Sequence, residues 1–248
     1  MKQWLCVKQT QQQDTNGIFL HQHQTHSLVE AKLTRILYTG TKNASSWALR
    51  AWLAMRELNI DFKECVVDIR KPQRFANLVR IASFSPPGAV PVLVDDGAVI
   101  FDSLAIMEYA NDIGGGSLLP TESRLRAQAR SLLAWVHSGM SDLCSTMSFE
   151  SSFYNEQCEL TEVELAEVTR VFTIWEQQLV RSGGPYLVGA LSLADLSFVP
   201  TIRRLLSRST NIMQWPLAHA WTERMMLRPS VREWMQEAES LPPVLLDE

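Results

Sequence analysis

The sequence has few cysteines, and they are not spaced as in disulfide frameworks, metal sites or redox motifs. Its four cysteines, Cys6, Cys65, Cys144 and Cys158, are scattered along the chain and form no C-x-x-C pair. This arrangement fits neither a disulfide framework nor a zinc site. Reduced thiols are typical of cytoplasmic proteins, so we expect a cytoplasmic location and no bound metal.

Long apolar runs and an excess of positive charge are also absent. No apolar run approaches the roughly 18 residues that suggest a membrane span, and the start of the chain lacks the apolar middle of a secretory signal. The net charge is -4, whereas a nucleic-acid partner favours a basic surface. We therefore expect no membrane and no nucleic acid among the partners. With 46% hydrophobic residues, the composition is that of a globular protein.

The amino-terminal segment, residues 1–33, is polar and includes the stretch "QQQDTNGIFLHQHQTH". Its composition predicts a disordered extension. His21, His23 and His26 could gather around a metal ion. Because no cysteine or carboxylate joins them at a familiar ligand spacing, we favour a solvated polar tail.

Residues 34–113 alternate between strand and helix patterns, which predicts the order βαβαββα. Asp95-Asp96-Gly97 separates two short apolar runs and is a strong signal for a β-hairpin. The first two strands flank a crossover helix and should be parallel, whereas the last two should be antiparallel. The segments that carry these patterns are "RILY", "SWALRAWLAMREL", "DFKECVVDI", "RFANLVRIA", "PVLV", "AVIF" and "LAIMEYAND".

A run of glycines that begins at Gly114 ends this pattern and predicts a linker over residues 114–120. Residues 121–248 then have almost only helical spacing, as in "ESRLRAQARSLLAWVHSGMSDL". Ser192 and Asp195 have the S-x-x-D spacing of a capping box, so we interpret Asp195 as structural. The chain is therefore predicted to be an α+β protein, in which an all-α domain follows a mixed domain.

Two adjacent serines, Ser45 and Ser46, stand between a predicted strand and a predicted helix. Serine is favoured at a helix start because its hydroxyl accepts a hydrogen bond from a free backbone N–H group. The same place offers partial positive charge and unpaired N–H groups to an anion. From the residues alone, a helix cap is favoured over an active site.

Several stretches resemble the cytosolic glutathione transferases over residues 34–238, in particular the serine-type, zeta-like members of bacterial type. "SSWALR" is similar to the Ser-Ser-Cys-x-x-Arg start of their first helix. "SPPGAVPVLVDDGAVIFDSLAIMEYAND" is similar to their glutathione-binding segment, and "LSLADLSFVP" to the capping-box helix of their second domain. The resemblance implies a thioredoxin-like βαβαββα domain followed by an all-α domain, in a detoxification enzyme with glutathione as co-substrate.

The resemblance implies that Ser45 and Ser46 are the catalytic residues that hold the glutathione sulfur. Ser45 is preferred because it stands five residues before Arg50, as in the zeta-like pattern. Trp47 departs from that pattern, which has cysteine there, and Tyr38 is a further hydroxyl that we interpret as a strand residue. A hydroxyl donor and a helix start could lower a thiol pKa near 8.5 by about one to two units. We predict that Ser45→Ala strongly lowers turnover without preventing folding.

The resemblance also implies how the rest of glutathione binds. Val90-Pro91 matches the family's cis-proline, and Val90 would pair with the cysteinyl part through its backbone. Asp102-Ser103 matches the pair that holds the γ-glutamyl end: Ser103 and the helix start can bind its carboxylate, and Asp102 its ammonium. Further basic residues have a less definite role. Arg203, Arg204 and Arg208 could reach an anionic second substrate, but we favour a solvated basic face. Arg70, Lys71 and Arg74 could approach the glycine carboxylate and are left unassigned.

The predicted function is that of a glutathione transferase whose thiolate attacks a small, electrophilic, mostly apolar substrate. Members of this family generally pair, so we expect a homodimer. No cysteine occupies the thiol site, which disfavours mixed-disulfide chemistry. The alternatives are a glutathione-dependent isomerase of the maleylacetoacetate type, a dehalogenase-like enzyme, or a non-catalytic binding module with the same fold.

Overall fold

The computed structural model describes residues 35–154, 159–208 and 211–244. The predicted amino-terminal extension and its three histidines lie outside the described residues. From residue 33 onward the chain forms one compact unit. None of the described helices is both long and apolar enough to cross a bilayer.

A four-stranded sheet with the order β2-β1-β3-β4 lies at the amino-terminal end of this unit. As predicted, β1 and β2 are parallel, and the hairpin of β3 and β4 is antiparallel. Asp96 and Gly97 form the tip of this hairpin with φ values of 47° and 84°, a conformation that glycine adopts without steric cost. The strands are β1 (Arg35–Gly40), β2 (Lys63–Val67), β3 (Val92–Asp95) and β4 (Ala98–Phe101).

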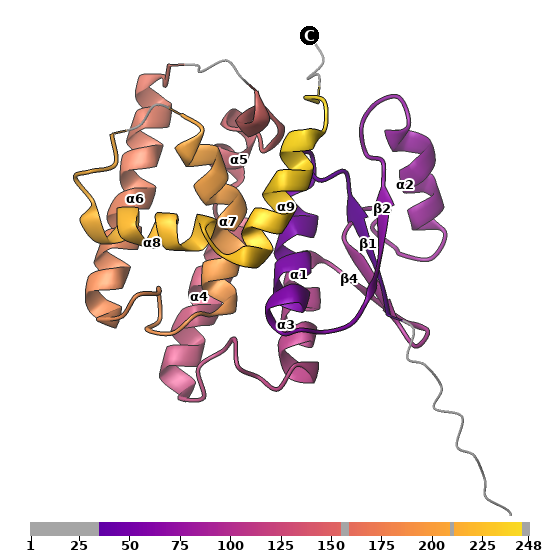
Figure 1. The fold of residues 1–248 in the computed structure, drawn as a ribbon, viewed down its shortest axis with the longest axis horizontal. Helices are drawn as coiled ribbons and strands as arrows, with labels where there is room; N and C mark the ends of the chain where they lie inside the picture. The colour runs from indigo at the N-terminus through magenta and orange to yellow at the C-terminus, as the bar shows by residue number, and fades with distance from the viewer. Residues whose placement is uncertain (1–34, 155–158, 209–210, 245–248) are drawn as a thin grey trace, which may run out of the picture. The chain divides into compact units, whose positions relative to one another are not determined.

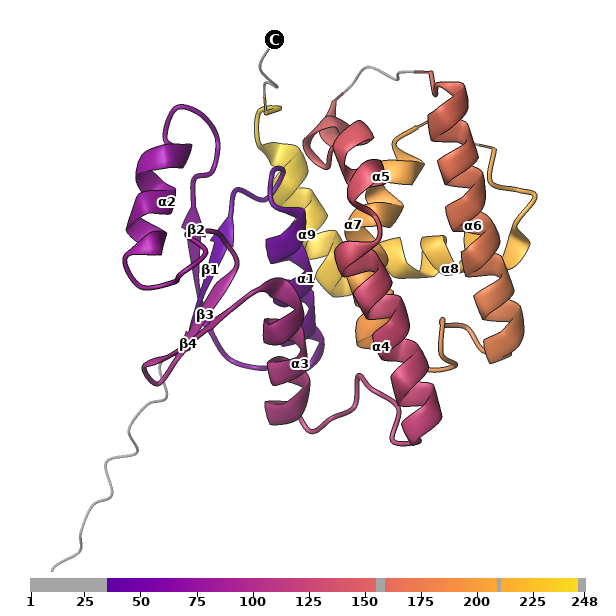
Figure 2. The ribbon, with the colours of Figure 1, turned by 180° about the vertical axis from the view of Figure 1, so that it is seen from behind.

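Three helices cover this sheet, and together they complete the predicted βαβαββα order. Helices α1 (Ser46–Glu57) and α3 (Ser103–Ile113) pack on one face. Helix α2 (Arg74–Ala82) lies on the opposite face, as the two views show (Figure 1, Figure 2). Helix α1 therefore lies between the sheet and the helices that follow.

All elements that the structure describes after residue 113 are helical. The predicted helical stretch that ends near Leu143 is divided at Gly139 into two helices. A Cβ atom at Gly139 would lie 2.7 Å from the Trp135 ring, so the chain needs glycine where the first of them ends. The helices are α4 (Ser123–Ser138), α5 (Ser141–Thr146), the 3-10 helix η1 (Glu150–Phe153), α6 (Glu162–Ser182), α7 (Leu193–Leu206), α8 (Pro216–Met226) and α9 (Pro229–Ser240).

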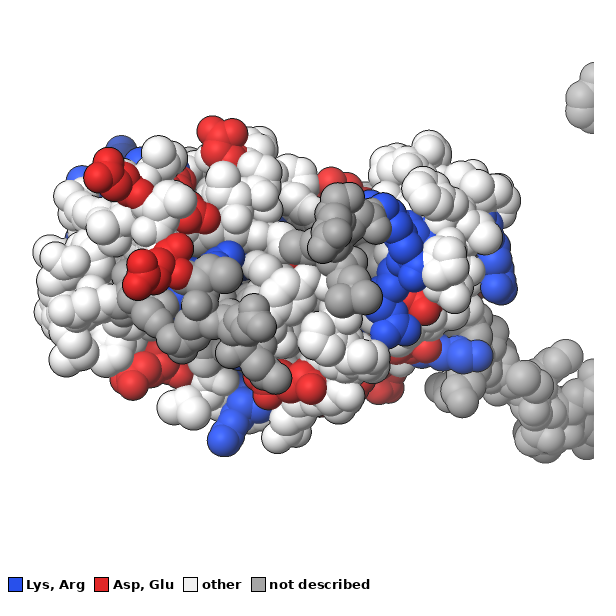
Figure 3. Space-filling model, turned by 90° about the horizontal axis from the view of Figure 1, so that it is seen from above, with Lys and Arg blue, Asp and Glu red and all other residues white. Residues whose placement is uncertain are grey.

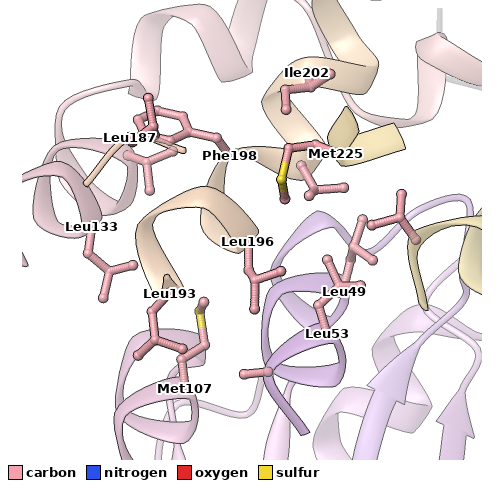
Figure 4. Close-up of a cluster of buried hydrophobic side chains, with 14 of the residues drawn as sticks. Leu49, Leu53, Met107, Leu133, Leu187, Leu193, Leu196, Phe198, Ile202 and Met225 are labelled. Carbon is pink, nitrogen blue, oxygen red and sulfur yellow. The ribbon is translucent and has the colours of Figure 1, made fainter. Parts of the chain in front are cut away.

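Helix α7 runs through the centre of the hydrophobic core and packs against α1, α4 and α8. Each leucine side chain that becomes fully buried contributes roughly 2 kcal/mol to stability. Side chains from five helices meet in this core (Figure 4): Leu49 and Leu53 on α1, Met107 on α3, Leu133 on α4, Leu193, Leu196, Phe198 and Ile202 on α7, and Met225 on α8.

The predicted capping box fixes the start of α7. Asp195 accepts hydrogen bonds from the Ser192 backbone N–H at 2.9 Å and the Ser192 hydroxyl at 2.7 Å. The same carboxylate also accepts from the Leu187 N–H and the Trp221 indole. Burial raises the pKa of Asp195, and these hydrogen bonds oppose that rise. The structural interpretation of Asp195 is consistent with all four contacts.

Candidate active site

The two serines lie where β1 passes into α1. Ser45 is the N-cap of α1, and its Oγ accepts a hydrogen bond from the Ala48 N–H at 3.3 Å. Gly40 brings the end of β1 close to this cap, because a Cβ atom there would lie only 2.7 Å from the Ser45 Cβ. Ser46 is the first residue of the helix, and its Oγ accepts from Arg204 Nη2 at 3.1 Å. The interpretation of Ser45 as a cap is therefore correct.

Both serines line a cavity of about 500 Å³. Its wall has three contributions: the start of α1, the segment around α2, and residues of the helical part of the chain. Lys and Arg side chains gather toward the end of the molecule that carries α2 (Figure 3). The side chains that matter for the chemistry of this cavity are Ser45, Ser46, Trp47, Arg70, Lys71, Arg74, Cys144, Phe149, Glu150 and Arg204.

A second cavity of about 390 Å³ adjoins the first, and Trp47, Ala89 and Val90 line both. It contains the other residues that the sequence predicts for glutathione, namely Pro91, Asp102 and Ser103. The structure thus brings all of the predicted site residues to two neighbouring cavities. The Val90–Pro91 peptide bond is cis.

Asp102 caps α3 and faces the second cavity. Its Oδ1 accepts from the Leu104 N–H at 2.8 Å, and its Oδ2 lies 3.4 Å from His137 Nε2 on α4. The φ of Asp102 is 74°, an unusual value for a residue other than glycine. A carboxylate held in this conformation beside a helix start suits the recognition of a zwitterionic group.

Trp47 lines both cavities. Its ring stacks on the Arg50 guanidinium, whose Cζ lies 4.1 Å from the ring centroid, and it meets the His137 ring edge to face at 5.3 Å. Trp47 is 37% exposed. The indole therefore faces both the cavities and solvent, on the helix that carries the two serines.

Arg204 is buried, so the interpretation of this residue as part of a solvated basic face is wrong. It is 4% exposed and lines the first cavity beside Ser46. Burial lowers the pKa of the Arg204 guanidinium. Burial also lowers the pKa of Arg50 to about 9, and the charge of Arg204 adds to this effect.

Unlike Arg204, the neighbouring arginines Arg203 and Arg208 line neither cavity, and Tyr38 lines neither of them. Arg203 pairs with Glu239 at 3.1 Å, and Arg208 donates weakly to Ser151 at 3.4 Å. Tyr38 is a residue of β1, as predicted. Its ring packs against Phe84.

The sequence-based prediction missed the residues that line the first cavity from α5 and from the chain at η1. Cys144, Phe149 and Glu150 come from α5 and from the chain at η1, where no periodic pattern or motif marks them. Among the basic residues near α2, Arg70 is paired with Asp68 and lowers the pKa of that carboxyl to about 2. In the described part of the chain, no group of three His, Cys, Asp or Glu side chains is arranged to hold a metal ion.

A mixed four-stranded sheet, a helix start that opens onto a cavity, and a following layer of helices together define the architecture of the glutathione-dependent transferases. Comparison with known proteins agrees. The family described as "Glutathione S-transferase, N-terminal domain" matches residues 44–113, and "Glutathione S-transferase, C-terminal domain" matches residues 141–238. The chain belongs to the glutathione S-transferase family, so it is a glutathione-dependent enzyme with glutathione as its co-substrate.

Individual relatives support the same assignment. A Caenorhabditis elegans protein named probable maleylacetoacetate isomerase is 31% identical over 169 residues, which cover 67% of this chain and 77% of the relative. Maleylacetoacetate isomerase of Mus musculus is 27% identical over 197 residues, which cover 77% and 88% of the two chains. Among solved structures, a Burkholderia glutathione transferase homolog with bound glutathione has a TM-score of 0.62 at 23% identity, covering 84% of this chain and 100% of the other.

Proposed function

We propose that this protein binds glutathione across the two cavities and converts its thiol to a thiolate at the start of α1. The observation that carries the proposal is the position of Ser45 and Ser46, which lie at a helix start and line one cavity. Each hydroxyl accepts one hydrogen bond from the protein, so each retains a proton that it can donate to sulfur. Ser45 remains the preferred donor.

The physical gain from this arrangement is a larger fraction of reactive sulfur. A thiol with a pKa near 8.5 is only a few per cent thiolate at neutral pH. A hydroxyl donor and the partial positive charge of the helix start both favour the anion. The thiolate would then form a carbon–sulfur bond with the electrophile, and the leaving group would depart with the electron pair.

The remaining parts of glutathione have suitable partners in the same two cavities. The γ-glutamyl end would lie at Asp102 and Ser103, and the cysteinyl backbone at Val90 beside the cis Pro91. Lys71 and Arg74 line the first cavity, which supports a role for them with the glycine carboxylate. These assignments follow the family pattern, and each can be tested by the glutathione KM of a single variant.

Isomerisation is the second candidate function. The relatives named maleylacetoacetate isomerase support it, and so does the cavity, because the charges of Arg74 and Arg204 make its electrostatic potential positive, which suits an acidic substrate. The mostly apolar second substrate expected from the sequence is less well matched to such a potential. In isomerisation the thiolate would add to the substrate and then leave again, so glutathione would not be consumed.

One experiment separates these functions. The purified protein is incubated with glutathione and either 1-chloro-2,4-dinitrobenzene or maleylacetoacetate, and both glutathione and products are quantified. A transferase yields the glutathionyl conjugate and consumes glutathione. An isomerase converts maleylacetoacetate to its isomer without net consumption of glutathione. Binding of glutathione with neither reaction would favour the non-catalytic module and contradict the proposal. The homodimer and the cytoplasmic location remain predictions, and sedimentation of the purified chain tests the first.

A further inference from the structure

Arg204 is a buried cation for which the described part of the chain provides no hydrogen-bonded carboxylate. Its Nη2 donates to the Ser46 hydroxyl, while its Nε and Nη1 have no hydrogen-bond partner there. An unpaired buried cation is costly, because the charge loses its hydration without a compensating acceptor. Such a group, placed in the wall of a cavity, makes the electrostatic potential there positive and favours an anion in the cavity.

Arg50 is a second cation of the same kind. It is 2% exposed, and none of its three guanidinium nitrogens has a hydrogen-bond partner among the described residues. It lies on α1 against the Trp47 ring, and its charge and that of Arg204 act on each other. Two buried positive charges are therefore associated with α1: Arg50 belongs to this helix, and Arg204 donates to its first residue, Ser46.

We propose that Arg204, reinforced by Arg50, lowers the thiol pKa of bound glutathione and so acts as a positioning residue for Ser46 and the sulfur. This inference rests on the proposed function. Because Ser46 accepts a charge-assisted hydrogen bond from Arg204, its own proton is directed elsewhere and is a stronger donor. The anion favoured in the cavity is the thiolate itself.

The exposure of the Arg204 atoms favours this long-range role over direct binding of a substrate carboxylate. Its two unpartnered nitrogens, Nε and Nη1, have almost no accessible surface, so a ligand in the cavity does not reach them. A charge acts at a distance, however. At an effective dielectric constant of about 20, a cation placed about 8 Å from any thiol lowers the pKa of that thiol by roughly one unit or more.

Other charged and titratable groups face the same space, and they set the background for any titration. Glu150 lines the cavity and opposes the arginines, while the Cys144 thiol interacts with both of them. Asp102 also acts on Arg50 and is close to His137. From the side of α2, the cavity is lined by Arg70, Lys71 and Arg74.

The test is an ultraviolet titration of the thiolate of bound glutathione in wild type, Arg204→Met, Arg204→Lys and Arg203→Gln. The spectrum of each protein without glutathione is subtracted, and Cys144→Ser checks that the signal is not from the protein. We expect Arg204→Met to raise the apparent pKa of the bound thiol by about one unit. Arg204→Lys keeps the positive charge, so the thiol pKa in this variant should lie closer to the wild-type value than in Arg204→Met. Arg203→Gln, on the same helix but paired with Glu239, should leave it unchanged.

Binding of S-methylglutathione gives a second readout, because this ligand has no ionisable thiol. Its affinity should be equal in wild type and Arg204→Met if the arginine acts on the thiolate. An equal thiol pKa in these two proteins would overturn the proposal, and so would a loss of S-methylglutathione affinity as large as that for glutathione. If wild type binds glutathione without any thiolate signal, the proposed function itself fails.

Discussion

The indole Nε1 of Trp234 on α9 donates a hydrogen bond to the backbone carbonyl oxygen of Lys42 at 3.0 Å. Both residues are buried, and the Lys42 ammonium lies 4.4 Å from the Trp234 ring centroid. Lys42 belongs to the short segment between β1 and α1, directly before the two serines. The last described helix therefore holds the loop that leads to the candidate active site.

We expect Trp234→Phe to weaken glutathione binding as well as stability. The substitution keeps an aromatic ring but leaves the Lys42 carbonyl without this donor, which costs about 1–2 kcal/mol. The same change at Trp215, whose indole donates to Thr173 on α6, is the matched control. Chemical denaturation should show a similar loss in both variants, whereas the glutathione KM should rise only in Trp234→Phe. A rise in both would contradict a local effect on the loop.

Ser45 and Ser46 should be separable by combining kinetics with stability. Ser45→Ala removes both a hydroxyl and the cap of α1, so we expect a loss of about 1 kcal/mol together with a strong fall in kcat/KM. Ser45→Gly should lose the same activity with a smaller loss of stability, because glycine is tolerated at an N-cap. Ser46→Ala should raise the thiol pKa without affecting the cap. Wild-type turnover in both Ser45 variants would transfer the principal role to Ser46.

The local parts of this site were predictable from the sequence because short-range chemistry determines them. Asp95-Asp96-Gly97 predicts the hairpin, and Ser192 with Asp195 predicts a capping box, since a few neighbouring residues suffice for both. The serine cap is local in the same sense. These features depend on turn geometry and backbone hydrogen bonds within a few residues.

The burial of Arg204 was not predictable in this way. Along α7 it follows Arg203, and two adjacent arginines indicate an exposed face unless the packing of the helix is known. Arg204 is buried because α7 packs against α1, which brings it to Ser46, a residue 158 positions earlier in the chain. Cys144 and Glu150 reach the cavity through the same long-range packing. Their sequence context has no signal for it.

Stability should fall at acidic pH through Glu57 at the end of α1. Burial raises the pKa of this carboxyl, but hydrogen bonds from Arg228 and Ser230 outweigh burial and leave the pKa below its ordinary value. A carboxyl with a lowered pKa in the folded state stabilises the protein above its unfolded pKa. That contribution is lost as the pH falls through the folded pKa, from about pH 5 downward.

Denaturation curves at several pH values test the role of Glu57. We expect the free energy of unfolding of Glu57→Gln to be about 2 kcal/mol lower than that of wild type at neutral pH. It should also fall less steeply than that of wild type as the pH is lowered. Glu233→Gln is the control, because Glu233 pairs with Arg56 at 2.6 Å on the surface, where such pairs contribute little. Equal acid dependence in Glu57→Gln and wild type would show that other carboxyls account for it.

Trp47 should determine which second substrates are accepted, because its large side chain lines both cavities. Trp47→Ala would enlarge the space at both cavities, so kcat/KM for a bulky aromatic electrophile should rise about tenfold relative to 1-chloro-2,4-dinitrobenzene. It also removes the ring that stacks on Arg50, which should cost roughly 1 kcal/mol of stability. Trp47→Phe retains an aromatic wall and should keep the wild-type preference. If the ratio is unchanged in Trp47→Ala, the bulky substrate binds away from this wall, and the second-substrate site must be sought deeper, toward Phe149 and Glu150.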